Sequence, residues 1–317
     1  MMRSELDAAG IHDPRLRAAY ERCRELNARH GRTFYLATRL LAPSQRPAVH
    51  ALYGFARLAD DILDDFDPEL TPALRAERLQ CLAAQFFDGG DHSDDPVLSA
   101  VIDTSRTYGI RAELFAAFLD SMRMDLTVTD YADRVALDRY VHGSAEVIGL
   151  QLLPILGTVG TEERAAPYAA ALGKAFQLTN FLRDVDEDLS RGRIYLPADE
   201  LAAHGVDREL LMWCHHHRRT EPRVRNALAA QHDRTRQVYR FAQAGVPRLA
   251  PRSRPCVATA LTLYSEILDR IEDSDYAVFC HRATVGTARR LQVASAGLVH
   301  AWWARTTRTG EPVTGAA

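Results

Sequence analysis

Acidic and amide side chains recur at a spacing of four residues in two separate stretches of this sequence. The residues concerned are Asp60 with Asp64 and Asp61 with Asp65 in the first stretch, and Asn180, Asp184 and Asp188 in the second. Residues four apart lie on one face of a helix, where like charges repel by about 0.2–0.5 kcal/mol per pair. A divalent cation offsets that repulsion, and Mg²⁺ is usually held by one or two carboxylates together with substrate phosphates. The spacing therefore indicates a magnesium-dependent site for a phosphorylated substrate.

A run of acidic residues is more often a solvated helix face than a metal site. Here, however, residues 51–59 and 175–179, which precede the two stretches, are too apolar for an exposed face. Arg57 lies three residues before Asp60, and Gln177 holds the corresponding place in the second stretch. Each column is thus extended by a group that can bind a phosphate or orient a ligand. Because polar groups on a buried stripe need partners, we favour the metal site.

The composition is that of a globular protein without a nucleic-acid signature. The chain has 317 residues, of which 47% are hydrophobic and 26% charged, and its formal net charge is −3. Its five cysteines are widely spaced and form no CxxC pair, which argues against a disulfide framework or a zinc ribbon and favours a reducing compartment. The N-terminus lacks the apolar core of a signal peptide, and no apolar run reaches the length of a membrane span. We therefore expect a cytoplasmic protein.

Helical periodicity predicts an all-α fold, because alternating strand patterns and hairpin turns are missing. Helices are expected at residues 14–29, 44–66, 72–87, 95–108, 111–128, 134–159, 162–189, 207–217, 222–243, 252–273 and 287–304. No linker divides the chain, so we expect one domain over residues 1–305 and a disordered tail over residues 306–317. Glycine-rich phosphate loops are absent, so metals and arginines would have to bind a phosphate.

A third informative stretch places Gly143, Ser144, Ala145 and Gly149 within one helical pattern. A glycine inside a helix costs about 1 kcal/mol relative to alanine, so these small residues need a reason. Two interpretations stay open: close packing against a neighbouring helix, or space for a bulky apolar ligand. Pro154 is expected to bend or end this helix.

Together, these motifs closely resemble the squalene and phytoene synthases, which are head-to-head prenyl diphosphate synthases. The segments that carry the resemblance are residues 53–64, 177–188 and 191–197. It extends from about His30 to about Arg282, and residues 143–149 and 195–201 look most like bacterial phytoene synthases. The family implies an all-helical isoprenoid synthase fold around a central apolar cavity, with two Asp-rich helices at its mouth.

The resemblance also implies roles for individual residues. The residues that would bind Mg²⁺, for which Mn²⁺ can substitute, are Asp60, Asp64, Asn180, Asp184 and Asp188. The residues that would contact the diphosphates are Arg57, Gln177, Asn180, Arg183, Arg193, Tyr195 and Arg282, and those that would line the pocket or its rim are Phe34, Tyr53 and Tyr140. Catalysis would depend on the four metal-binding aspartates with Arg57 and Tyr195, while the ligand role of Asp61 stays open.

The function implied by the resemblance is phytoene synthesis in carotenoid biosynthesis. Two geranylgeranyl diphosphates would be joined through a cyclopropyl diphosphate, prephytoene diphosphate, and the last cation would lose a proton, so no NADPH is expected. Metal and arginines would neutralise the leaving diphosphate, and an apolar, water-free pocket would protect the carbocation. The expected partners are prenyl diphosphates and not nucleic acid, while peripheral contact with the inner face of the membrane and a homo-oligomer stay open.

Other interpretations share some of these motifs. A squalene or dehydrosqualene synthase would use farnesyl diphosphate instead, and a cyclising terpene synthase or a non-catalytic helical relative is less compatible with the residue types. The chain also departs from the family pattern: Gly31 and Thr33 replace serines at the entrance motif, Asp186 stands where glycine is common, and Glu146 replaces a small residue. Whether Asp186 and Glu146 face the pocket is left open by the sequence.

Overall fold

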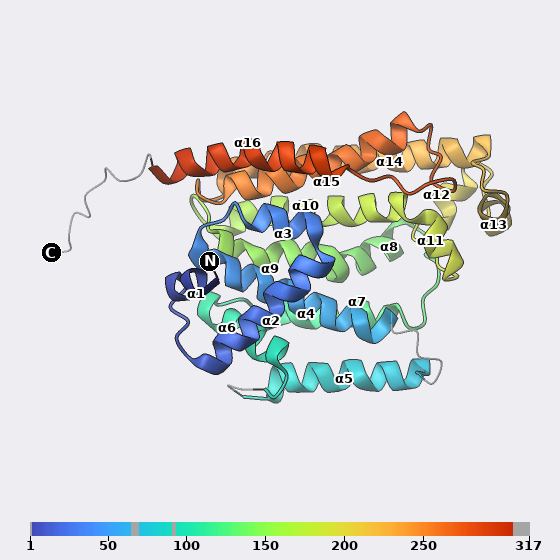
Figure 1. Cartoon of the computed structure of the whole chain (residues 1–317). Coiled ribbons are helices and arrows are strands. Elements are labelled where there is room, and N and C mark those ends of the chain that lie inside the picture. The colour runs from blue at the N-terminus through green and yellow to red at the C-terminus, as the bar shows by residue number, and fades with distance from the viewer. Residues whose placement is uncertain (1, 65–69, 91–92, 307–317) are drawn as a thin grey trace.

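Helices make up every regular element that the structure describes. The computed structural model describes residues 2–64, 70–90 and 93–306, and within these residues isolated β-bridges occur in place of strands. Most of the helices run side by side along the long direction of the molecule (Figure 1). The prediction of an all-α fold is therefore confirmed.

The helices agree closely with those predicted from periodicity. In chain order they are α1 Met2–Ala8, α2 Pro14–His30, α3 Arg32–Thr38, η1 Pro43–Gln45, α4 Arg46–Asp64, α5 Pro72–Asp88, α6 Pro96–Tyr108, α7 Ala112–Met124, α8 Arg134–Val141, η2 His142–Glu146, α9 Val147–Leu156, α10 Glu162–Arg183, α11 Val185–Ser190, α12 Ala198–Ala202, α13 Arg208–His217, α14 Pro222–Gln243, η3 Val246–Arg248, α15 Arg254–Asp273 and α16 Thr287–Thr306. The sequence pattern does not predict α1, α3 or α12, because such short helices have too few turns to show a period.

Capping residues explain where several of these helices begin and end. At the start of α6, the Asp95 side chain accepts hydrogen bonds from the backbone N–H groups of Val97 (2.7 Å) and Leu98 (3.1 Å), and Pro96 occupies the first turn. The helix stops at Gly109, whose φ of 62° is left-handed. The same Asp-Pro pair that marks the helix in the sequence therefore starts it in the structure.

The two Asp-rich stretches lie at the same end of the molecule. Helix α10 runs through the middle of the body and packs against α9, α14 and α15, whereas α4 packs against α2, α6 and α9. The C-terminal ends of α4 and α10 both point to the right in Figure 1. Because α4 has 19 residues, its N-terminal end lies about 28 Å away, at the opposite side of the body.

The glycine-rich stretch packs its backbone directly against neighbouring helices. The helix predicted over residues 134–159 is divided into α8, a π-helical turn η2 and α9, with Pro154 inside α9. A Cβ atom on Gly143, Gly149 or Gly173 would lie 2.2 Å from a backbone carbonyl oxygen of α7, α10 or η2, respectively. Of the two interpretations of this stretch, close helix packing is therefore the one that these glycines satisfy.

Candidate active site

The second Asp-rich stretch crosses the junction between α10 and α11. Asp184 ends α10 and begins α11 with φ −104° and ψ 13°, so the helix predicted over residues 162–189 is broken at this residue. Helical hydrogen bonding nevertheless continues across the break. The N–H of Asp184 donates to the carbonyl of Asn180 and that of Asp188 donates to the carbonyl of Asp184, each at 2.8 Å. The column of three ligand residues that the spacing predicts is therefore kept in register.

Two arginines hold the carboxylate of Asp184. Arg183 donates from Nε to Oδ1 (2.8 Å) and from Nη2 to Oδ2 (2.5 Å), and Arg282 donates to the same two atoms at 2.7 and 3.0 Å. Burial raises the pKa of Asp184, but the hydrogen bonds from Arg183 and Arg282 outweigh it and leave the pKa below its ordinary value. Asp184 is therefore anionic at neutral pH, as a metal ligand must be.

Asn180 and Asp188 supply the other oxygen atoms of this column. The side-chain oxygen of Asn180 is buried and has no hydrogen-bond partner, which is costly unless a ligand satisfies it. Burial, reinforced by the charge of Asp184, raises the pKa of Asp188 to about 7. A cation would satisfy the Asn180 oxygen and favour the charged form of Asp188, so these donors fit a hard, oxygen-binding divalent metal.

The residues proposed as metal ligands do not form a closed cluster among the described residues. Within the described residues, no three His, Cys, Asp or Glu side chains are gathered closely enough to hold a metal ion on their own.

The first Asp-rich stretch forms the last turns of α4. Arg57 donates a hydrogen bond to the carboxylate of Asp61, so Asp61 is engaged by an arginine, and the Nε atom of Arg57 is buried without a partner. Burial raises the pKa of Tyr53 to about 12, with the nearby charge of Asp60 adding to the shift. The side chain of Asp64 lies outside the residues that the structure describes. Arg57 and Asp60 therefore both lie near enough to Tyr53 for their charges to act on its phenol.

Tyr264 of α15 connects the surroundings of the two stretches. Burial raises the pKa of Tyr264, the nearby charge of Arg183 partly offsets that rise, and Tyr264 is also close enough to Tyr53 to raise the pKa of that phenol. Its ring packs against Phe34 and Phe176 with centroid distances of 5.0 and 4.4 Å. The sequence analysis does not identify Tyr264, because it lies on the apolar face of an ordinary amphipathic helix and no spacing distinguishes it.

A buried carboxylate, Asp125, holds three further predicted residues, Tyr140, Tyr195 and Arg193. It accepts hydrogen bonds from the hydroxyls of Tyr140 (2.8 Å) and Tyr195 (3.0 Å), and its backbone carbonyl accepts one from Arg193 (2.9 Å). Arg193 is also near enough to Asp188 to lower the pKa of that carboxyl group. The structure therefore places this tyrosine cluster near Asp188. Asp125 has no acidic partner at helical spacing in the sequence, so no pattern could have indicated it.

Asp186 and Glu146 are both held by basic residues outside the predicted site. Asp186 lies 2.7 Å from His215 Nδ1, and its second oxygen accepts a hydrogen bond from Arg218. Glu146 lies 3.0 Å from His142 Nδ1 in the same helical turn. Both carboxylates thus already have basic partners in the structure.

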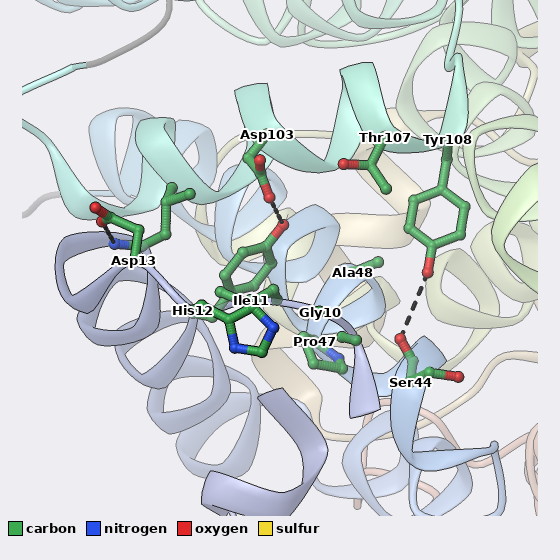
Figure 2. Close-up of a pocket in the computed structure, with 13 residues that line it drawn as sticks. Gly10, Ile11, His12, Asp13, Ser44, Pro47, Ala48, Asp103, Thr107 and Tyr108 are labelled. Carbon is green, nitrogen blue, oxygen red and sulfur yellow. Dashed lines mark hydrogen bonds between the residues drawn. The ribbon is translucent and has the colours of Figure 1, made fainter. Parts of the chain in front are cut away.

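A separate cavity lies at the opposite end of the molecule from the two Asp-rich stretches. It has a volume of about 300 Å³ between the α1–α2 connection, the start of α4 and α6 (Figure 2). In it, the hydroxyl of Tyr20 donates to Asp103 at 2.6 Å, and the hydroxyl of Tyr108 reaches the backbone carbonyl of Ser44. None of the predicted site residues lines this cavity, so it is distinct from the Asp-rich site.

The fold and the two Asp-rich helix ends define the class of the protein as an all-α isoprenoid synthase. The profile of the squalene/phytoene synthase family matches residues 27–292, most of the chain. The chain therefore belongs to the squalene/phytoene synthase family, as the resemblance of its motifs predicts.

Among curated proteins, the chain is similar to phytoene synthases of plants and cyanobacteria. It is 37% identical to the chloroplastic phytoene synthase of Daucus carota over 294 residues, which cover 91% of this chain and 72% of that protein. It is 35% identical to the 15-cis-phytoene synthase of Synechococcus elongatus over 286 residues, which cover 87% and 91%. The match to the chloroplastic phytoene synthase 1 of Arabidopsis thaliana covers 86% of this chain but only 64% of the Arabidopsis protein.

Solved structures with the same fold include two enzymes of the family. A dehydrosqualene synthase in complex with a ligand superposes with a TM-score of 0.80 at 25% identity, covering 90% of this chain and 97% of that one. The squalene synthase HpnC from Alicyclobacillus acidocaldarius superposes with a TM-score of 0.73 at 26% identity, covering 85% and 98%. Over the described residues, none of the helices combines the length and the hydropathy needed to cross a bilayer.

Proposed function

We propose that the protein is a phytoene synthase that condenses two geranylgeranyl diphosphates head to head in carotenoid biosynthesis. The observation that carries this proposal is the similarity to phytoene synthases, at 35–37% identity over most of the chain. The site adds a chemical reason, because its carboxylates and arginines suit a diphosphate leaving group. The alternative, a squalene or dehydrosqualene synthase using farnesyl diphosphate, is supported by structural neighbours of lower identity.

The first step requires that negative charge on the leaving diphosphate be stabilised. Arg183 and Arg282 each direct two parallel donors at Asp184, and the same fork geometry fits two oxygens of a phosphate. Mg²⁺, which Mn²⁺ can replace, would supply Lewis-acid stabilisation when held by the metal ligands proposed from the sequence. Those ligands are Asp60, Asp64, Asn180, Asp184 and Asp188. Arg57, Gln177 and Arg193 are the further residues that we assign to the diphosphates.

The carbocation that forms needs an apolar surface that excludes water. Phe34, Phe176 and Tyr264 form a continuous aromatic surface next to Arg183. A cation over an aromatic face is stabilised by about 0.5–2 kcal/mol, and a ring cannot add to the cation as water would. Tyr53, Tyr140 and Tyr195 extend this surface in the proposal. Their burial raises their pKa values, which keeps the phenols neutral donors.

In phytoene formation the last cation loses a proton, so the reaction needs no NADPH. The test is to incubate the purified protein and Mg²⁺ with geranylgeranyl diphosphate and with farnesyl diphosphate separately, each with and without NADPH. A C40 hydrocarbon from the geranylgeranyl substrate that does not depend on NADPH is the expected product. A C30 product alone would instead assign the farnesyl substrate, and a reduced C30 product that needs NADPH would assign squalene synthesis.

We place this reaction in the cytoplasm, close to the membrane surface that receives the product. All five cysteines are free thiols, as in a reducing compartment. The product is a hydrocarbon, so its release from the protein requires an apolar acceptor, for which a membrane is the natural choice. Peripheral contact with the inner face of the membrane is the expectation that follows, and sedimentation with lipid vesicles in the presence and absence of substrate tests it.

A further inference from the structure

The connection between α15 and α16, residues 274–286, carries Arg282 to the active site, and we call it the strap. Phe279 and Ala283 are buried in the core at 0% and 7% exposure, whereas residues 280–282 between them are exposed. The side chain of Arg282 itself is 53% exposed. Burial therefore anchors the strap on both sides of this short exposed segment but does not by itself set the position of Arg282.

Arg218, at the C-terminal end of α13, contacts this exposed segment through two opposed hydrogen bonds. Its backbone carbonyl accepts a hydrogen bond from the thiol of Cys280 (2.9 Å), and its Nη2 donates to the carbonyl of Cys280 (3.1 Å). Arg218 itself has a φ of 51°, a left-handed conformation that is unfavourable for an arginine and that its surroundings must hold. The backbone two residues before Arg282 is thus fixed to the end of α13.

The same guanidinium also reaches α11. Arg218 donates from Nη1 to the carboxylate of Asp186, whose other oxygen lies 2.7 Å from His215 Nδ1. Asp186 stands in the first turn of α11, two residues after Asp184 and two before Asp188. Arg218 therefore joins the strap to the helix that carries two of the proposed metal ligands.

We propose that Arg218, held by Asp186, is a positioning residue that keeps Arg282 aligned with Asp184 for diphosphate binding. The inference rests on the diphosphate site of the proposed function. When a long, exposed arginine binds diphosphate it loses conformational entropy, which weakens binding. Because the strap is already fixed at Cys280, Arg282 has less conformational entropy to lose when diphosphate binds. Within the described residues, the guanidinium of Arg218 donates its hydrogen bonds to Asp186 and Cys280 and not to a proposed ligand, so we expect its effect on diphosphate to be transmitted through Arg282.

The test measures the binding of inorganic diphosphate to the full chain by calorimetry in the presence of Mg²⁺. Arg218→Ala is expected to weaken binding about tenfold, the scale on which partners of ligand residues act. Arg282→Ala is expected to weaken it more. Because Arg218 acts through Arg282, adding Arg218→Ala to Arg282→Ala should bring no further loss.

Two further variants separate positioning from a general effect on the fold. Arg218→Lys keeps a charge opposite Asp186 but cannot donate to Asp186 and Cys280 in the same fork geometry, so an intermediate loss is expected. Arg225→Ala is the matched control. Arg225 is also a partly exposed arginine that pairs with the strap, because its Nε lies 3.3 Å from the carboxylate of Asp275. This contact, however, lies about seven residues before Arg282. Arg225→Ala should bind diphosphate normally, and all variants should keep the wild-type melting temperature within a few degrees.

Two results would overturn the proposal. One is normal diphosphate affinity in Arg218→Ala, and the other is an equal additional loss when Arg218→Ala is added to Arg282→Ala. Should Arg218→Ala fail to fold, Arg218→Lys and Asp186→Asn carry the same comparison. Normal binding by Arg282→Ala would be a different failure, since it would remove Arg282 from the diphosphate site of the proposed function.

Discussion

Arg282 and Asp184 lie 98 residues apart in the sequence, yet two parallel hydrogen bonds of 2.7 and 3.0 Å join their side chains. Arg183 donates to the same two oxygen atoms. Both arginines therefore have an anionic partner before any substrate arrives, and Arg183, which is largely buried, is not left as an uncompensated charge. A diphosphate offers more oxygen atoms and more charge than one carboxylate, so it can compete for the same donors.

Replacing Asp184 should separate its role in catalysis from its role in pairing the arginines. Asp184→Asn keeps one acceptor for Arg183 but loses the negative charge that a metal needs, so turnover should fall by more than about a hundredfold. Asp184→Ala leaves Arg183 without its carboxylate and should in addition lower the free energy of unfolding by about 3 kcal/mol. Steady-state kinetics and urea unfolding of both variants measure the two effects.

Asp60→Ala provides the comparison for the first Asp-rich stretch. Asp60 is a proposed metal ligand, so its removal should abolish turnover. Because Asp60 is partly exposed near the end of α4, the free energy of unfolding should change little. Near-normal turnover in Asp60→Ala or Asp184→Asn would show that these carboxylates are not metal ligands.

The sequence predicts the chemistry of this site better than its construction. The four-residue spacing of Asn180, Asp184 and Asp188 needs only the period of a helix, and it survives the break at Asp184 because the backbone hydrogen bonds continue. Contacts such as Asp125 with Tyr140 depend on where separate helices pack, and no local pattern encodes that. The same holds for Tyr264, which is recognisable only once its ring is seen between residues of other helices.

The open question about the small residues illustrates the same limit. Glycines at helical spacing indicate that something approaches closely, but the sequence does not say whether it is a ligand or a backbone. A Cβ added at Gly143 or Gly149 would lie 2.2 Å from a carbonyl oxygen of α7 or α10, so it is the backbone of a neighbouring helix that approaches these glycines. The tail predicted to be disordered, residues 306–317, lies outside the described residues except for its first.

Tyr264→Phe should weaken diphosphate binding while leaving the aromatic surface intact. The phenylalanine ring keeps the packing against Phe34 and Phe176 but loses the hydroxyl that lies near Arg183. A hydrogen bond from this hydroxyl to a charged group of the diphosphate complex would contribute about 1.5–3 kcal/mol, so the dissociation constant for diphosphate should rise about tenfold or more. Calorimetry with Mg²⁺ and diphosphate measures this change, and Tyr168→Phe, at the surface between α10 and α14, is the control that should bind normally. Equal affinities of the two variants would contradict the role assigned to Tyr264.

Adding a methyl group at the close helix contacts should destabilise the fold. Gly149→Ala and Gly173→Ala each place a Cβ 2.2 Å from a facing carbonyl oxygen, so the helices have to move apart. Overpacking of this kind typically costs about 1–3 kcal/mol. Gly286→Ala is the control, since nothing lies within 4 Å of its Cβ position. In urea unfolding, Gly149→Ala and Gly173→Ala should have lower midpoint concentrations than Gly286→Ala. If all three variants have the same midpoint, the helix contacts are looser than the structure indicates.

His50 should make the protein less stable as the pH falls. The ring is 2% exposed, and its Nδ1 lies 2.9 Å from the Asn27 amide nitrogen. Burial, with the nearby charges of Arg24 and Arg46, lowers the pKa of His50 from 6.5 to about 3. Between these two pH values the unfolded chain binds a proton that the folded protein does not, so His50 contributes a loss of up to about 1.4 kcal/mol of unfolding free energy for each unit of decrease in pH.

His50→Gln removes this titration while keeping a polar side chain that can accept a hydrogen bond from Asn27. Its unfolding free energy should therefore fall less steeply than that of the wild type between pH 6.5 and pH 4.5, even if the variant is less stable at pH 7. The matched variant His12→Gln replaces an exposed histidine and should keep the wild-type slope. Denaturant unfolding at half-unit steps of pH gives the three slopes. Equal slopes of unfolding free energy against pH for His50→Gln and the wild type would contradict this prediction. They would mean that His50 binds a proton equally in the folded and the unfolded protein, because only then does its titration leave the unfolding free energy unchanged.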